Sequence, residues 1–212
     1  MTNSINEENL KYLEKDRKDI LNQIPIRFSD VKKEDIPQNV LKVFDDILDE
    51  KGLYMFGSCG VGKTHIAWSL FKHKTEQRFS EAREYLGKKG NEGRHVSVRS
   101  NIQVYSWVEV LRLLRDSMIN KEKYRGAYSI EEDFDPQILI LDDVGSEKAS
   151  DWTIETLYYL INKRYEEKKP TIITSNLPLS ELADKVGDRI TSRIAEMCEI
   201  VRLEGKDKRL EK

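Results

Sequence analysis

One stretch restricts what this chain can fold into more than any other. It is Gly57-Ser58-Cys59-Gly60-Val61-Gly62-Lys63-Thr64, which reads G-x-x-x-x-G-K-T. An apolar run, Leu53 to Phe56, precedes it, and a helix-compatible run, Thr64 to Leu70, follows it. In that context a buried strand delivers the loop to a helix N-terminus, where backbone N–H groups bind phosphate. Glycines let these N–H groups converge at positions where a Cβ would intrude. The pattern therefore predicts a phosphate-binding loop in an α/β fold.

A second motif supplies the acidic half of the predicted site. Four apolar residues, Ile138 to Leu141, predict a strand buried on both faces of a parallel sheet, and Asp142 and Asp143 follow it. Carboxylates at the end of such a strand fall where open α/β sheets place ligands. We expect Thr64 and Asp142 to hold Mg²⁺, the latter directly or through water, while Lys63 reaches the β- and γ-phosphates of ATP. Asp143 is then the candidate general base that polarises the attacking water.

Composition limits the alternatives. With 212 residues, 38% of them hydrophobic, the chain can form a single domain with a sizeable core. The net charge of −2 excludes overall basicity, so any DNA-binding surface must be local. Cys59 and Cys198 have neither metal-ligand nor disulfide-framework spacing. Without an apolar signal segment or a membrane-length run, we expect a cytoplasmic protein that makes no membrane contact.

Strand-like runs alternate with helical patterns along the chain. That alternation predicts a five-stranded parallel sheet with helices on both faces. The expected strands cover residues 52–56, 102–106, 137–141, 171–175 and 199–203.

The N-terminal region and two basic segments each allow two interpretations. Residues 7–24 predict an amphipathic helix, either packed on the main body or used as a partner-binding arm, and residues 25–36 look extended. The basic stretch 72–99 is either a solvated face or a surface for a phosphate backbone. Residues 120–128, which combine Lys and Arg with Tyr, are either a surface loop or a single-strand contact.

Four polar residues near the ends of later elements are further candidates. Asn176 follows the strand expected beside the phosphate loop, where its amide can orient water, or it caps a turn. Arg164 is either a solvated cation at a helix end or a charge offered to a neighbouring subunit. Arg189 and Arg193 share one helical face at i, i+4 spacing.

Taken in order, these motifs resemble the helicase-loader family of AAA+ ATPases, the DnaC/DnaI group, and the related IstB transposition helpers. The resemblance covers about residues 25–209. Its motifs are Gly-Ser-Cys-Gly-Val-Gly-Lys-Thr-His (57–65), Leu-Ile-Leu-Asp-Asp-Val-Gly (139–145), Asn-Lys-Arg-Tyr (162–165), Ile-Ile-Thr-Ser-Asn-Leu (172–177) and Gly-Asp-Arg-Ile-Thr-Ser-Arg-Ile (187–194).

The resemblance implies a P-loop NTPase of AAA+ type and gives roles to particular residues. His65 joins the nucleotide-binding stretch, and Asn176 resembles sensor I, which reads the γ-phosphate. Arg193, or else Arg189, resembles the arginine finger offered to the next subunit. Arg209 resembles the sensor II position. Because little chain follows the last strand, the helical lid of AAA+ proteins is missing or reduced.

The resemblance also implies an organisation and a role. Residues 1–25 form a helix that is a possible partner-binding arm, residues 26–209 form the ATPase core and residues 210–212 are a tail. The expected function is ATP-dependent loading or remodelling of a replicative DNA helicase on single-stranded DNA, with Mg²⁺-dependent hydrolysis at interfaces between self-associated subunits. The alternatives are an IstB-like transposition helper acting on duplex DNA and a nucleotide-dependent adaptor with little turnover.

Overall fold

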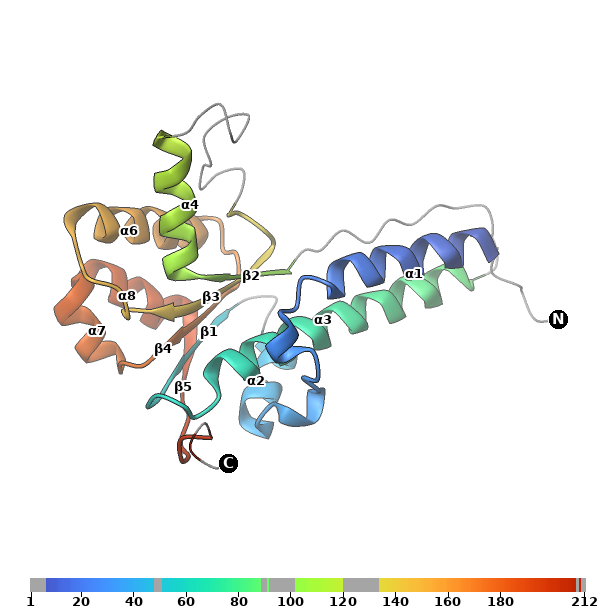
Figure 1. Ribbon diagram of the computed structural model, residues 1–212, viewed down its shortest axis with the longest axis horizontal. Helices are drawn as coiled ribbons and strands as arrows, with labels where there is room; N and C mark the ends of the chain where they lie inside the picture. The colour runs from blue at the N-terminus through green and yellow to red at the C-terminus, as the bar shows by residue number, and fades with distance from the viewer. Residues whose placement is uncertain are drawn as a thin grey trace.

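The computed structural model describes residues 7–47, 51–88, 91, 102–119, 134–208 and 210. These residues contain a five-stranded sheet (Figure 1), in which every pairing is parallel. The strands are β1 (Gly52–Phe56), β2 (Ile102–Ser106), β3 (Ile138–Val144), β4 (Thr171–Ser175) and β5 (Cys198–Arg202). The predicted parallel sheet is confirmed. The one clear difference is that β3 continues to Val144, so that both aspartates lie inside the strand.

The order of the strands, β2-β3-β4-β1-β5, brings the predicted site together. β1 lies between β4 and β5, with Met55 opposite Thr174 and Phe56 opposite Ser175. β4 in turn pairs with β3. Because all the strands are parallel, their carboxyl ends lie at one edge of the sheet. This edge carries the P-loop after β1, the aspartates near the end of β3 and Asn176 after β4.

Helices cover both faces of the sheet, as predicted (Figure 1). α1 (Glu7–Leu21), α2 (Gln38–Ile47) and α3 (Lys63–Leu86) share one core with Leu53 and Met55 of β1. α4 (Trp107–Ile119), α6 (Asp151–Glu166), α7 (Leu179–Val186) and α8 (Asp188–Met197) share the other core with Tyr54. Successive residues of β1 therefore face opposite layers, as the twofold period of a strand requires. No helix of the described residues is long and apolar enough to cross a membrane.

α1 packs along α3 in an antiparallel pair that extends away from the sheet (Figure 1). Leu13 and Ile20 are buried in the seam. Arg17 donates two hydrogen bonds to the Glu76 carboxylate, at 2.8 and 2.5 Å. The structure thus shows this helix packed on the main body.

The prediction that residues 25–36 are extended is wrong. They form two 3₁₀ turns, Ile26–Phe28 and Lys33–Asp35. The Asp35 carboxylate accepts a hydrogen bond from the Lys32 N–H at 2.7 Å, which closes the second turn. Val31 and Ile36 are buried. Compact turns bring both side chains to the core while the polar residues between them stay outside.

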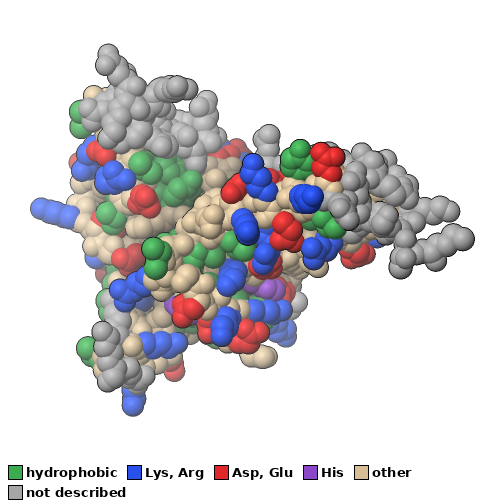
Figure 2. Space-filling model, turned by 45° about the vertical axis from the view of Figure 1, so that its right-hand side comes forward, with side chains coloured by type: hydrophobic (Ala, Val, Ile, Leu, Met, Phe, Trp, Pro, Cys, Tyr) green, Lys and Arg blue, Asp and Glu red, His purple; other side chains and the backbone are tan. Residues whose placement is uncertain are grey.

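The described part of the basic stretch 72–99 supports the solvated-face interpretation. Lys72 donates to the Val31 carbonyl at 2.8 Å, Arg83 pairs with Glu14 at 3.0 Å and Lys88 pairs with Glu84 at 3.2 Å. Basic and acidic side chains are interspersed on the face shown in Figure 2. Residues 89, 90 and 92–99 lie outside the described residues, so the stretch 72–99 is tested only in part. All of residues 120–128 lie outside them, so that candidate segment is not tested.

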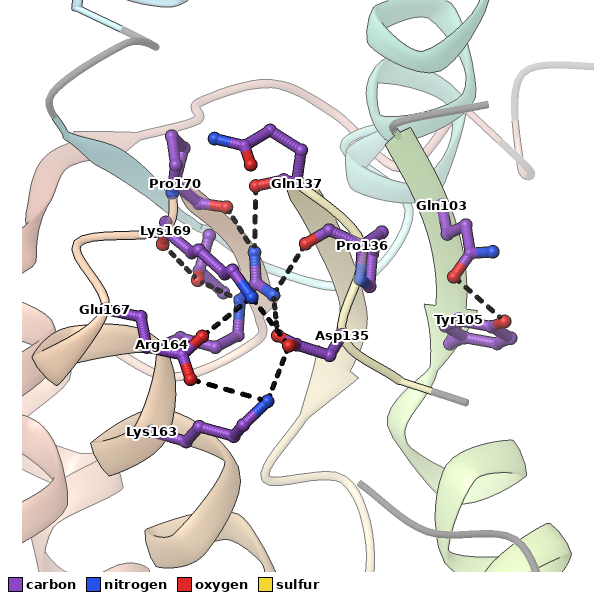
Figure 3. Close-up of polar contacts among 11 residues, drawn as sticks. Gln103, Tyr105, Asp135, Pro136, Gln137, Lys163, Arg164, Glu167, Lys169 and Pro170 are labelled. Atoms are coloured by element: carbon purple, nitrogen blue, oxygen red, sulfur yellow. Dashed lines mark hydrogen bonds and ion pairs between the residues drawn. The ribbon is translucent and has the colours of Figure 1, made fainter. Parts of the chain in front are cut away.

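Arg164 is neither a solvated cation nor a charge offered to another subunit, so both interpretations were wrong. Its side chain is fully buried. Figure 3 shows its guanidinium among the starts of two strands. It donates to the Thr171 hydroxyl at 2.7 Å, to the Pro136 carbonyl at 2.9 Å and to the Pro170 carbonyl at 2.8 Å, and it pairs with Asp135 at 3.2 Å. Arg164 therefore connects the end of α6 to the residues just before β3 and to the start of β4.

Asp135 is the anion at the centre of this network. Its carboxylate also accepts hydrogen bonds from Lys163 at 2.5 Å and Lys169 at 2.6 Å. Burial by itself raises the pKa of Asp135, but the bonds and charges of the two lysines outweigh burial and lower it. For Arg164, burial lowers the pKa to about 10, which is still far enough above neutral pH for the guanidinium to stay charged. The network therefore stabilises the fold above the unfolded-state pKa of the carboxyl, and this contribution is lost as the pH falls through the lower folded-state pKa.

Replacing Arg164 by Met should lower the free energy of unfolding by about 3 kcal/mol, because it removes a buried charge and leaves carbonyls and a carboxylate without their partner. Urea unfolding measures the change. Arg112→Met is the matched control, since it breaks an exposed pair with Asp116 and should cost no more than about 0.5 kcal/mol. Equal effects of the two substitutions would contradict a structural role for the buried network.

Candidate nucleotide-binding site

The P-loop connects β1 to α3 at the edge of the sheet where the strands end. Gly60 and Gly62 have φ angles of 83° and 101°, in the left-handed region that side chains disfavour. Val61 between them is buried in the core under α3 and anchors the loop. The two glycines let the backbone turn tightly above this anchor and enter α3 without side chains of their own over the N–H groups, as phosphate binding requires.

Lys63 is held at this loop by backbone oxygens. Its side chain is almost fully buried, and its ammonium group donates to the Gly57 carbonyl at 2.7 Å and to the Ser58 carbonyl at 2.8 Å. A buried ammonium group needs such acceptors to offset its lost hydration. The charge is thereby placed at the loop that would receive phosphate.

Hydrogen bonds connect the loop to β3 and β4. The Thr64 hydroxyl donates to Oδ2 of Asp142 at 2.9 Å, and the Thr174 hydroxyl donates to Oδ1 at 2.6 Å. Burial raises the pKa of Asp142, with a smaller contribution from the neighbouring Asp143 charge, while the two hydroxyls and Lys63 oppose the rise.

A buried carboxylate next to a hydroxyl offers the oxygen ligands that Mg²⁺ prefers. No group of three or more His, Cys, Asp or Glu side chains among the described residues could hold a metal alone. Thr64 and Asp142 would therefore share Mg²⁺ with phosphate and water oxygens.

Asp143 occupies a strained position in a β-bulge. Between Leu141 and Val144 the pairing of β3 with β4 shifts, and Asp143 has a φ of 62°, which is uncommon for a residue with a side chain. Its N–H donates to the Thr174 hydroxyl at 2.9 Å, and its carboxylate accepts from the Asn176 amide at 3.2 Å. Bulges and left-handed residues cluster at functional sites, where surrounding contacts offset their cost. Here the bulge places the Asp143 carboxylate beside Asn176.

Cys59 connects Asn176 to the P-loop. Its thiol donates to the Asn176 amide oxygen at 3.8 Å, from a position exposed to solvent. The structure thus brings together the P-loop residues 57–64, both aspartates of β3 and Asn176, as the motifs predict.

Two further residues shape this region, although no sequence motif predicted them. Thr174 bridges both aspartates with one hydroxyl, yet within a strand it reads only as a β-former. Glu147 accepts hydrogen bonds from the Trp107 indole and from the Gly145 N–H, both at 3.0 Å, and so fixes the turn after β3 against α4. The alternation of β4 could have placed Thr174 on one face, but only its register with β3 puts its hydroxyl against Asp142.

The other candidate residues lie elsewhere or outside the described residues. His65 is 3.0 Å from the Asp35 carboxylate and packs edge-on against Phe28, so it contacts the turns before α2. Arg209 lies outside the described residues. The described residues after β5 contain no helix.

Arg193 and Arg189 lie on α8, packed beside α6. Arg193 donates to the Asn162 side chain at 2.8 Å, and its guanidinium lies 5.2 and 5.7 Å from the ring centres of Tyr158 and Tyr165. Arg189 is exposed and makes no side-chain hydrogen bond or ion pair within the described part of the chain. The polar and cation–π contacts of Arg193 within the described residues are with α6 and α8. The rings of Tyr158 and Tyr165 on α6 help to orient its guanidinium.

Comparison with known proteins gives this architecture a family context. Residues 94–212, more than half of the chain, match the IstB-like ATP-binding protein family. The crystal structure of the DnaC helicase loader superposes with a TM-score of 0.62 at 25% identity, covering 85% of this chain and all of that one. The replicative helicase loader DnaI of Bacillus subtilis strain 168 is 22% identical over 80% of this chain and 51% of its own length.

Replication initiators are also similar. The chromosomal replication initiator protein DnaA of Wolbachia pipientis wMel is 26% identical over 161 residues, which is 74% of this chain and 29% of that protein. This chain therefore spans about half of DnaI and less than a third of DnaA. Its similarity to these proteins is confined to that share of their length.

Replacing Asp142 by Asn should stabilise the protein when no nucleotide is present. The raised pKa means that folding disfavours the ionised carboxyl. That penalty is present above the raised pKa and disappears below the unfolded-state value of about 4. We expect a gain in the free energy of unfolding of about 0.5–2 kcal/mol at neutral pH, which shrinks as the medium is acidified.

Urea titrations at a series of pH values measure this difference. The two threonine hydroxyls can accept as well as donate, so the Asn side chain can keep both contacts. A variant less stable than the wild type at neutral pH would show that the carboxylate carries no desolvation cost.

Proposed function

Because this chain belongs to the family of IstB-like ATP-binding proteins, we propose that it is a Mg²⁺-dependent ATPase that assists DNA replication. Its finer role in this proposal is to load or remodel a replicative DNA helicase on single-stranded DNA. The observation that carries the ATPase proposal is the Thr64–Asp142 hydrogen bond, which joins the phosphate loop to the acidic strand.

Binding of ATP would exchange contacts that are already in place. Phosphate oxygens would replace the carbonyl oxygens of Gly57 and Ser58 as partners of the Lys63 ammonium group. The loop N–H groups and the N-terminus of α3 favour the phosphate charge. Mg²⁺ supplies charge neutralisation at the phosphates when bound, and Thr64 and Asp142 would hold it.

Hydrolysis would depend on Asp143 and Asn176. The hydrogen bond between them fixes the direction of the carboxylate, as a general base that must polarise one water molecule requires. Asn176 is close enough to the loop, through Cys59, to respond to a γ-phosphate. Thr174 would keep both aspartates in position.

An arginine from a neighbouring subunit would complete the reaction. Arg193 and the exposed Arg189 present their charges on the α6–α8 side, and an arginine supplied in trans stabilises charge on the transferring phosphoryl group. Self-association through this side would make turnover depend on assembly. Of the two, we favour Arg193 as the finger, because α6 orients its guanidinium.

The replication role is supported by the likeness to the DnaC and DnaI helicase loaders. We assign residues 26–209 to the ATPase core and the segment 1–25 to partner contact. Although the inner face of α1 is buried on α3, its outer face leaves Tyr12 about half exposed. A transposition helper acting on duplex DNA is the second candidate, since the matched family is IstB-like. An adaptor with little turnover is the third.

Replacing Asp143 by Asn should leave ATP binding within about threefold of wild type while lowering kcat by about a hundredfold or more, the size expected for loss of a general base. Calorimetric binding and steady-state phosphate release, with and without DNA, measure the two effects. Lys63→Ala is the control that should abolish binding. Unchanged turnover in the Asn variant would remove Asp143 from the mechanism, and absent turnover in the wild type would favour the adaptor.

We expect a complex of defined stoichiometry with a hexameric replicative helicase in ATP that weakens in ADP, and native mass spectrometry can detect it. Tyr12→Ala tests the outer face of α1 better than deletion of residues 1–25, because deletion would expose the core around Leu13 and Ile20. Absence of a complex in both nucleotide states would contradict the loader role. Filament formation on duplex DNA would then support the transposition helper.

A further inference from the structure

The segment after β5 runs onto the P-loop. The Leu203 N–H donates to the Phe56 carbonyl at 2.7 Å, so the ladder between β5 and β1 continues past the last strand residue. The Leu203 carbonyl then lies so close to Gly57 that a Cβ there would collide with it. The following residues, Glu204–Lys208, are called the strap here.

The end of the strap contacts the glycines of the P-loop. The Lys208 N–H donates to the Gly60 carbonyl at 3.1 Å, and the Lys208 ammonium group lies 3.6 Å from the position of a Cβ on Gly62. The Asp207 carboxylate lies against Gly60, where a Cβ would overlap it. Asp207 is partly buried, whereas Glu204 and Lys206 are exposed. The strap therefore turns one carboxylate toward the loop.

This placement matters because the P-loop is built to attract anions. Its N–H groups and the positive end of the α3 dipole favour a negative charge, whether a carboxylate or a phosphate. Gly60 lacks a side chain, and in this structure the Asp207 carboxylate occupies the space that a side chain would fill. A phosphate that enters the loop would meet this charge within a few ångströms, and like charges at that distance repel.

We propose that the strap is a nucleotide gate, in which the Asp207 carboxylate occupies the approach to the phosphate loop and must move away before ATP binds. The inference rests on the proposed nucleotide function. Asp207 thus lowers the affinity for ATP, and any partner that draws the strap off the loop raises it. The Lys208 ammonium group offsets part of the repulsion, so the effect of Asp207 is moderate.

Asp207→Asn tests the gate, because it removes the charge and keeps the shape of the side chain. We expect the Kd for ATP with Mg²⁺ to fall by about three- to tenfold, the range for a like-charge contact partly screened by solvent. The gain should shrink at high salt. Glu204→Gln is the matched control, since it removes the same charge from an exposed position on the same strap, where Glu204 pairs with Arg202. Its Kd should equal that of the wild type.

The outcomes separate the gate from the nucleotide function. Equal Kd values for wild type and Asp207→Asn, with ATP bound by both, would overturn the gate and leave the proposed function in place. An equal gain in Glu204→Gln would also overturn it, because the effect would then reflect net charge. If none of the three proteins binds ATP, the nucleotide function fails and the gate fails with it. Circular dichroism of each protein confirms that it is folded.

Discussion

The buried carboxylate of Asp142 is the group around which the site is built. Hydrogen bonds from Thr64 and Thr174 join it to the first residues of α3 and to β4, so three elements meet at one charge. Burying a carboxylate is unfavourable unless hydrogen bonds or a cation offset the lost hydration. The raised pKa of Asp142 indicates that the two hydroxyls do not fully offset it. A divalent cation at this position would remove the remaining cost.

The opposite edge of the sheet uses buried charge differently. There, Arg164 of α6 pairs with Asp135, just before β3, and Lys163 and Lys169 also pair with Asp135. The pKa of Asp135 is lowered, whereas that of Asp142 is raised. One edge therefore contains ionised groups that satisfy one another and fix the strands. The edge with the nucleotide site retains a buried carboxylate, Asp142, whose lost hydration is not fully offset and which a bound cation could neutralise. Such a loss of stability is common at functional sites.

Both terminal segments of the described chain are tied to α3 and the P-loop that precedes it. α1 packs along α3 through Arg17 and Glu76, and the strap packs on the loop through Lys208 and Gly60. A nucleotide bound at the P-loop would contact or displace the strap directly. α1 contacts α3, the helix that follows the P-loop, at a point further along the chain. In the proposed function, this arrangement connects the phosphates to the surfaces that meet partners.

Local sequence was sufficient for the framework. The glycine pattern of residues 57–64, the apolar run before Asp142 and the alternation of helix with strand are determined by backbone sterics and by burial, which act over a few residues. They predicted the parallel sheet, the P-loop and the edge where the site lies. Tertiary structure alone decided the rest. The bulge at Asp143, the bridging role of Thr174 and the burial of Arg164 depend on which strands become neighbours and in what register. A hydroxyl, a guanidinium or the Asp207 carboxylate acquires its role from partners that are distant in sequence, and no local pattern specifies those partners.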